Sequence, residues 1–399
     1  MQQESDSKAV TETSPLRIFA AACMIAVGFC FVAGFYYFSV SEKAAANKDF
    51  IAYWAAGRQL AHGANPYDDA AVLHLEQAVG LEGNTAVIMR NPPIAFFLAL
   101  PLGFIGAKAG FILWSLVLLG SLSLANWMIW IVNGSPDSRL HLLGYLFAPA
   151  LACQMAGQLG TFLLLGVVLF LWLHKNHPYL AGASLVLCAL KPHLFLPFFL
   201  VLTLWSVYRR EFRIFVGFTI SLLAVCALSF FLDIHAWSQY SQMIRTAEIE
   251  NEFVPTLSMV VRLLLNQKAA WLQFLPEVCG CIWAGWYFGS RRDRWNWMEQ
   301  GLLLLLISAM CSPYAWFSDE TMLLPAVMAG LFRAVKLGRS VLPLVLFAGA
   351  AFFEIHQQIK MTTPYYLWTV PAWLAWYLYA STPKRTGEPP TNAAEESIV

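Results

Sequence analysis

The chain has 399 residues, of which 59% are hydrophobic and only 12% are charged, whereas a soluble domain carries about a quarter charged residues. So few charges do not cover a soluble core that would hold 16 Trp, 29 Phe and 14 Tyr, and the aromatic content also excludes disorder. A formal net charge of +1 excludes a basic nucleic-acid binder. We therefore expect an all-α, polytopic integral membrane protein that binds no nucleic acid.

The order of apolar segments predicts about twelve transmembrane helices. Residues 1–16 are polar and read as a cytoplasmic tail, and residues 381–399 as a disordered cytoplasmic tail. The first apolar run, 17–40, is too long and aromatic for a signal peptide, so we expect an uncleaved span within a transmembrane domain over 17–380. The other expected spans are 93–107, 109–132, 141–156, 158–174, 178–206, 213–232, 270–289, 297–311, 319–336, 340–356 and 365–380.

The positive charges predict which side of the membrane each loop faces. With a cytoplasmic N-terminus, fourteen of the 25 cations fall in inner segments, Lys108 among them, and most of these loops are short. Ten fall outside, including Arg139 and Lys175, and Lys191 falls within a span. The larger number of positive charges in the inner segments fits the positive-inside rule. Two long loops, 41–92 and 233–269, are then expected on the periplasmic side.

The first long loop opens with Asp49, directly after the first expected span. Residues 50–62 read as an amphipathic helix whose aromatic side chains, Phe50, Tyr53 and Trp54, lie at the membrane interface. A carboxylate at this level suits a general base that acts where lipid and water meet. An ordinary solvated aspartate explains the same position, so both interpretations stay open.

Three further polar positions carry two interpretations each. Arg90 precedes the second expected span and suits either a lipid phosphate or a snorkelling anchor. Gln158 lies between two spans and suits either a site or a hydrogen bond between helices. Lys191-Pro192-His193 interrupts the apolar run 178–206, where proline predicts a kink or a break. Its cation either neutralises a phosphate facing a cavity or pairs with a carboxylate on another helix.

A late outer segment, Ser312 to Glu320, contains Tyr314 and Asp319. Its carboxylates open a helix, where the helix dipole favours negative charge. Alternatively, the segment places sugar-binding hydroxyls and an aromatic platform on the same side as Asp49. The sequence has no P-loop, dinucleotide fingerprint, HExxH or DxD, and its cysteines do not show zinc-site spacing. We therefore expect no cofactor and no metal.

Five short motifs, in this order, resemble membrane glycosyltransferases of the GT-C superfamily, and specifically glycosyltransferase family 87. The resemblance covers about residues 17–380. The motifs are Asp49 with Tyr53-Trp54 and Gly63-Ala64-Asn65-Pro66-Tyr67-Asp68, Asn91-Pro92-Pro93 with Pro101-Leu102, Gly157-Gln158, Ala181-Gly182 leading to Lys191-Pro192, and Ser312-Pro313-Tyr314 leading to Asp319.

The resemblance implies a metal-independent, inverting hexosyltransferase of the bacterial inner membrane and cell envelope, whose active site faces the periplasm. The donor would be a polyprenyl-phosphate sugar, with mannose as the expected hexose, and the acceptor a lipid or glycan. Asp49 would be the catalytic base. The expected substrate-binding residues are Lys191, His193, Arg90, Asp319, Tyr53, Trp54, Gln158 and Tyr314.

Two other functions remain open at this point. A secondary transporter or lipid flippase of about twelve spans would place ionisable residues near the middle of the membrane, in corresponding positions of two related halves. A non-catalytic membrane scaffold would have no cavity near Asp49. Clustering of the acidic residues at the outer face favours the transferase.

Overall fold

The structure, a computed structural model, describes residues 34, 41–246 and 253–382, and these residues form helices and loops without a strand. The all-α prediction is therefore confirmed for this part of the chain. The expected first span, 17–40, and the expected tails, 1–16 and 381–399, lie outside the described residues except for Gly34, Ser381 and Thr382.

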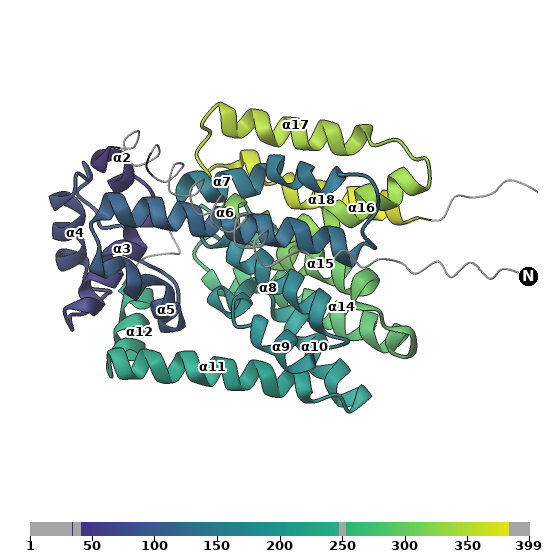
Figure 1. Cartoon of the computed structure of the whole chain (residues 1–399), viewed down its shortest axis with the longest axis horizontal. Coiled ribbons are helices and arrows are strands. Elements are labelled where there is room, and N and C mark those ends of the chain that lie inside the picture. The colour runs from purple at the N-terminus through teal and green to yellow at the C-terminus, as the bar shows by residue number, and fades with distance from the viewer. Residues whose placement is uncertain (1–33, 35–40, 247–252, 383–399) are drawn as a thin grey trace, which may run out of the picture.

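Most of the longer helices run along the long axis of the molecule, side by side (Figure 1). The α-helices are α2 Glu42–Ala46, α3 Phe50–Ala61, α4 Asp69–Ala78, α5 Phe96–Ala99, α6 Ala107–Val132, α7 Ala148–Ala156, α8 Gly160–Leu173, α9 Pro178–Ser184, α10 Leu196–Arg209, α11 Arg213–Leu232, α12 Ala236–Thr246, α13 Leu257–Leu265, α14 Leu275–Arg291, α15 Leu302–Cys311, α16 Leu324–Lys336, α17 Leu342–His356 and α18 Thr369–Ser381. Short 3₁₀ segments join several of them, among them η2 Leu100–Phe104, η3 Leu140–Leu146 and η10 Phe317–Leu323.

Two helices, α6 and α11, are long and apolar enough to cross a bilayer. Helix α11 is mostly exposed within the protein, with only 17% of its most apolar window buried, as a lipid-facing helix would be. The other apolar helices of the described part are between 10 and 17 residues long. The length and composition of these two helices are compatible with a membrane span, and the count of about twelve spans rests on the sequence.

The helix bundle has two distinct ends. One end, which we call the Asp49 end, contains α2 to α5, shown in purple to blue in Figure 1. Helix α14 packs through Gly280 against Pro197 and Cys311. It then runs to the opposite end of the bundle, where it finishes at Arg291, next to Arg292. We call this opposite end the Arg292 end.

The expected second span, 93–107, does not run from one end to the other. It begins beside α3, where Tyr53 bonds Asn91, and returns to α3, where the Trp54 indole donates to the carbonyl of Ile105 at 2.9 Å. The returning segment packs directly against the backbone of α3 at Gly57. Only glycine fits there, since a Cβ on Gly57 would lie 2.0 Å from the carbonyl oxygen of Ala99. The prediction of a crossing helix here was wrong, and Lys108 lies at the Asp49 end.

The expected span 178–206 is a hairpin with Lys191 at its tip. Its first arm packs against the start of α11, since a Cβ on Gly182 would lie 1.9 Å from the Ile214 carbonyl oxygen. Its second arm, α10, ends at Arg209, four residues before α11. Both arms thus end together at the Arg292 end, and the predicted kink is a full reversal. The segment 93–107 therefore makes one pass fewer along the bundle than expected, and the segment 178–206 makes one pass more.

Two cations, Arg139 and Lys175, lie at a different end of the bundle from the one expected. Helix α6 starts at the Asp49 end, where Gly110 contacts Phe50, and ends before Arg139. Helix α8 leads away from that end and finishes two residues before Lys175. Arg139 and Lys175 were expected on the same side as Asp49, whereas in the structure both lie at the Arg292 end.

Helix α3 was expected between residues 50 and 62, and the structure confirms it. Its aromatic side chains, however, do not lie on an outer surface. Phe50, Tyr53 and Trp54 are each at most 5% exposed, because α3 is enclosed by α6 and by the segment that returns through η2. The expected interfacial position of these rings was wrong, and α3 is part of the protein core.

Candidate active site

Asp49 is the residue before α3, and its carboxylate is held by a glutamine. The side-chain amide of Gln158 donates to Asp49 Oδ2 at 2.6 Å, and Asp49 is exposed. The turn that carries Gln158 lies against the start of α3. Gly157 adopts φ +77°, and a Cβ there would lie 2.7 Å from Phe50 Cβ. The hydrogen bond from Gln158 engages Oδ2 of this exposed carboxylate.

Tyr53, one turn along α3, is buried and contacts the same Gln158 side chain. Its hydroxyl lies 3.3 Å from Gln158 Oε1 and 3.2 Å from Asn91 Oδ1, and it can donate its proton to either oxygen. Burial, followed by the nearby negative charges of Asp49 and Asp319, raises the pKa of Tyr53 well above its ordinary value. Tyr53 is therefore a neutral hydrogen-bond donor at physiological pH.

Lys191 and Asp319 form a buried ion pair. Lys191 Nζ lies 2.7 Å from Asp319 Oδ1, and their side chains are 10% and 1% exposed. The other oxygen of Asp319 accepts from the backbone N–H of Trp316 at 3.0 Å, which fixes the carboxylate at the start of η10. Of the two interpretations of Lys191, pairing with a carboxylate from another part of the chain is the one that the structure shows. The pair lies at the Asp49 end.

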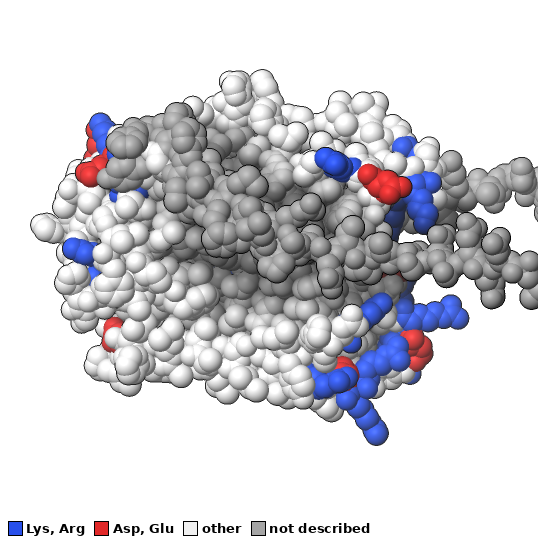
Figure 2. All heavy atoms as spheres, viewed as in Figure 1, with Lys and Arg blue, Asp and Glu red and all other residues white. Residues whose placement is uncertain are grey.

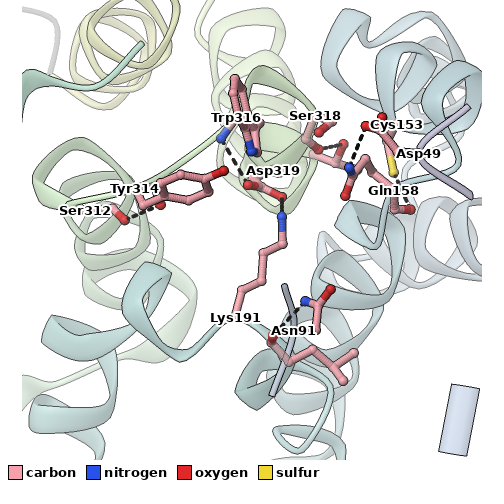
Figure 3. A network of polar contacts seen from close by, with 12 residues as sticks. Asp49, Asn91, Cys153, Gln158, Lys191, Ser312, Tyr314, Trp316, Ser318 and Asp319 are labelled. Atoms are coloured by element: carbon pink, nitrogen blue, oxygen red, sulfur yellow. Dashed lines mark hydrogen bonds and ion pairs between the residues drawn. The ribbon is translucent and has the colours of Figure 1, made fainter. Parts of the chain in front are cut away.

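Asn91 joins the two halves of the site. Its Nδ2 donates at 3.1 Å to the carbonyl of Leu190, the residue before Lys191, and its own backbone carbonyl accepts from the Tyr67 hydroxyl at 3.1 Å. Figure 3 shows the Asp49–Gln158 contact, Asn91 and the Lys191–Asp319 pair around one region. We call the following residues the site network: Asp49, Tyr53, Asn91, Gln158, Lys191 and Asp319.

Two more expected residues lie beside the network. The His193 and Tyr314 rings meet edge to face, with their centroids 6.0 Å apart, and His193 is two residues after Lys191. Ser312 Oγ donates to the carbonyl of Tyr314 at 2.9 Å and holds this turn. Arg90, which immediately precedes Asn91, is half-buried.

Trp54 is the expected substrate-binding residue that the structure does not bring to the network. Its indole N–H donates to the carbonyl of Ile105, and its ring lies against Gly110 at the start of α6. Trp54 thus fastens the returning segment onto α3. Its neighbour Tyr53 points the other way, toward Gln158 and Asn91.

Two residues that were not among the expected site residues make defined hydrogen bonds at or beside the network. Asn91 was part of a recognised motif but had no assigned role, and only its long-range bonds reveal one. Glu320, next to Asp319, is 4% exposed and accepts from Thr369 Oγ1 at 2.5 Å and from Trp373 Nε1 at 2.9 Å. Its adjacency to Asp319 was the available signal. Through Glu320, α18 anchors the segment that carries Asp319.

A small cavity of about 130 Å³ lies on the Glu320 side of this segment. It is mainly apolar, and the residues that line it do not include those expected to bind substrate. Within the described ranges, no three His, Cys, Asp or Glu side chains come together as a metal site would require. The cavity is lined by Pro255, Thr256, Leu257, Val260, Ala309, Met310, Ala315, Glu320, Leu367, Val370 and Pro371.

Comparison with models of protein families identifies a match. The model of glycosyltransferase family 87 matches residues 90–335, which is more than half of the chain. The matched segment contains Asn91, Gln158, Lys191 and Asp319, and Asp49 precedes it. No curated protein and no solved structure matches the chain. On the strength of the family match, the chain belongs to glycosyltransferase family 87 and is a glycosyltransferase.

Proposed function

We propose that this glycosyltransferase is an inverting hexosyltransferase of the bacterial inner membrane, with its active site on the periplasmic side. It would transfer a hexose, with mannose as the first candidate, from a polyprenyl-phosphate sugar to a lipid or glycan acceptor. The observation that carries the proposal is the site network. Residues from five separate parts of the chain bring an exposed carboxylate and a buried cation to one end of the bundle.

Asp49 is the proposed general base. Its Oδ1 would accept the proton of the acceptor hydroxyl while the acceptor oxygen bonds to the anomeric carbon. At the same time the bond from that carbon to the phosphate oxygen breaks, which inverts the anomeric centre. Gln158 supports this role because its amide donates to the other carboxylate oxygen and orients the group.

Lys191 is the proposed partner of the lipid phosphate that leaves. A monophosphate needs positive charge as the bond breaks, and a buried ammonium stabilises charge better than a solvated one. An ammonium has three donors, and the structure shows one of them on Asp319. A donor phosphate would engage the others, with His193 and Arg90 as additional groups on the same side.

The proposed membrane orientation follows the positions of the cations. Arginines from the loop after α10 and from the end of α14 gather at the Arg292 end, and Arg139 and Lys175 join them there. This distribution supports a cytoplasmic Arg292 end and a periplasmic Asp49 end. Helices α6 and α11 are the spans with the strongest support.

The competing transporter function receives less support. It requires ionisable groups near the middle of the bilayer. Lys191, the residue that had suggested such a position, is at the tip of a hairpin beside Asp319 at the Asp49 end. The transferase accounts for both residues as parts of one site.

The proposal is tested by a donor panel. Membranes that contain the protein, and matched membranes without it, are incubated with radiolabelled polyprenyl-phosphate mannose, glucose, arabinose or galactosamine. We expect label to pass to an endogenous lipid or glycan from one of these donors and only where the protein is present. Equal transfer in the two membranes for every donor would reject a polyprenyl-phosphate donor.

A further inference from the structure

Six exposed arginines gather at the Arg292 end in two loops that are far apart in sequence. Figure 2 shows Lys and Arg side chains concentrated at this end of the visible face. The two loops hold only two acidic residues, Glu211 and Asp293, which leaves a net charge of +4. We call the set the arginine patch, and its members are Arg209, Arg210, Arg213, Arg291, Arg292 and Arg294.

The arginine patch is a defined structure because its two loops are bonded to each other. The Tyr208 hydroxyl donates to Asp293 Oδ1, and Arg209 Nη2 donates to the backbone carbonyl of Asp293 at 2.9 Å. The Arg292 guanidinium lies 5.1 Å from the centre of the Tyr208 ring, a cation–π distance. These contacts hold the end of α14 next to the end of α10.

Both carboxylates of the patch are already engaged within it. Asp293 accepts from Tyr208, and Glu211 accepts from Arg213 Nε at 2.7 Å and from Arg213 Nη2 at 2.6 Å. Arg210, Arg292 and Arg294 are therefore exposed cations whose neighbouring carboxylates are turned to other partners. Such guanidinium groups match the oxygens of a phosphate.

An exposed apolar surface leads away from the patch along three helices. Val207 of α10 is 60% exposed, Trp286 of α14 is 66% exposed and Ile220 of α11 is 61% exposed. Leu204 and Ile282 continue the exposed strips of α10 and α14 by one turn. A soluble anion would contact the arginines alone, whereas an amphiphile with a negatively charged headgroup would contact both the arginines and the apolar surface.

We propose that the arginine patch and the adjoining strips of α10 and α14 bind an anionic phospholipid. The phosphate of the headgroup contacts Arg210, Arg292 and Arg294. The acyl chains lie along the strips that contain Val207 and Trp286. Charge complementarity selects a lipid of net negative charge over a zwitterionic one, and clusters of this size next to apolar helices are typical of such binding.

The test measures lipid affinity of the purified full-length protein in a neutral detergent. The ligands are dioctanoyl phosphatidylglycerol, dioctanoyl phosphatidylcholine and glycerol 3-phosphate, which carries a phosphate without acyl chains. The triple variant R210Q/R292Q/R294Q removes three charges from the patch. The control R245Q/K268Q/K360Q removes three exposed charges that lie outside the arginine patch. Thermal unfolding of each variant establishes that it is folded.

We expect phosphatidylglycerol to bind more tightly than phosphatidylcholine, and its affinity to fall about five-fold for each arginine removed while the control keeps native affinity. Equal binding of the two lipids, or equal affinity of the triple variant and the native protein, would overturn the proposal. Displacement of phosphatidylglycerol by an equal concentration of glycerol 3-phosphate would also overturn it, in favour of a soluble phosphate ligand.

Discussion

The side-chain amide of Asn91 donates to the backbone carbonyl of Leu190 at 3.1 Å, and Leu190 immediately precedes Lys191. The same side chain accepts from Tyr53, whose hydroxyl also reaches Gln158 and, through it, Asp49. One buried asparagine thus connects the exposed carboxylate with the buried ion pair. This connection is the reason why we treat the two halves as one candidate site.

Substitution of Asn91 by alanine tests this connection. The side chain makes hydrogen bonds at both its oxygen and its nitrogen, so Asn91→Ala should lower the free energy of unfolding by about 1–3 kcal/mol and reduce the transfer rate at saturating donor. Asn126 is the matched control, because it is 1% exposed and its side-chain atoms make no hydrogen bond to the described part of the chain. Asn126→Ala should change both quantities less. Equal losses in the two variants would show that Asn91 is only a packing residue.

A charge at position 158 should change the pH dependence of transfer. In Gln158→Glu, a second carboxylate would lie about 2.6 Å from Asp49, and two like charges at that distance raise the pKa of one of them. If Asp49 must be ionised to act, the acid limb of the pH–rate profile moves to higher pH. Gln242→Glu, which adds the same charge on α12, should leave the profile in place. A profile unmoved in both variants would argue against ionised Asp49 as the base.

The Lys191–Asp319 pair should behave as a coupled unit. Removal of one partner leaves an unpaired buried charge, so Lys191→Met and Asp319→Leu should each destabilise the protein by about 3–5 kcal/mol. The double variant should be more stable than either single variant, since no unpaired charge remains. Thermal unfolding of the native protein and the three variants completes the cycle. Additive losses would mean that the two groups do not interact energetically.

Glu76, in the first long loop, should make stability depend on pH. Its side chain is buried, with Oε2 accepting from the Val87 N–H at 3.0 Å, and burial raises its pKa from 4.5 to about 7. The folded protein therefore binds this proton more tightly than the unfolded chain. The resulting stability is complete below pH 4.5 and is lost as the pH rises to about 7.

The variant Glu76→Gln imitates the protonated side chain and keeps an acceptor for Val87. We expect its melting temperature to fall less between pH 5 and pH 8 than that of the native protein. Glu82→Gln serves as the control, since Glu82 is exposed in the same loop and pairs with Lys43 at the surface. If Glu76→Gln and the native protein show the same fall, Glu76 does not titrate in this range.

Much of the site was predictable because charge is scarce in this sequence. Asp49, Lys191 and Asp319 stand out as ionisable residues at the margins of apolar runs, and the structure brings Lys191 and Asp319 into contact. The path of the chain was less predictable. Residues 93–107 are as apolar as a crossing helix, and their return to α3 depends on Gly57 and Gly103 meeting at close range. Contacts between residues so distant in sequence leave no periodic pattern.

The reversal at Lys191 illustrates the same limit. Pro192 predicts a break, but a kink and a reversal have the same local sequence, and the choice depends on Gly182 packing against α11. Asn91 likewise has an ordinary turn sequence, and only its bonds to Tyr53 and to Leu190 give it a role. Local propensity thus predicted the helices, whereas long-range packing decided the site.

The rate of sugar transfer by Asp49→Asn tests the central claim most directly. The measurement compares it with Asp68→Asn, in which the exposed aspartate that caps α4 is replaced by another good capping residue. With a donor that the native protein uses, we predict that Asp49→Asn loses about 10²- to 10⁴-fold in rate, the usual contribution of a general base, while Asp68→Asn stays within about two-fold of native. A native rate for Asp49→Asn would contradict the account.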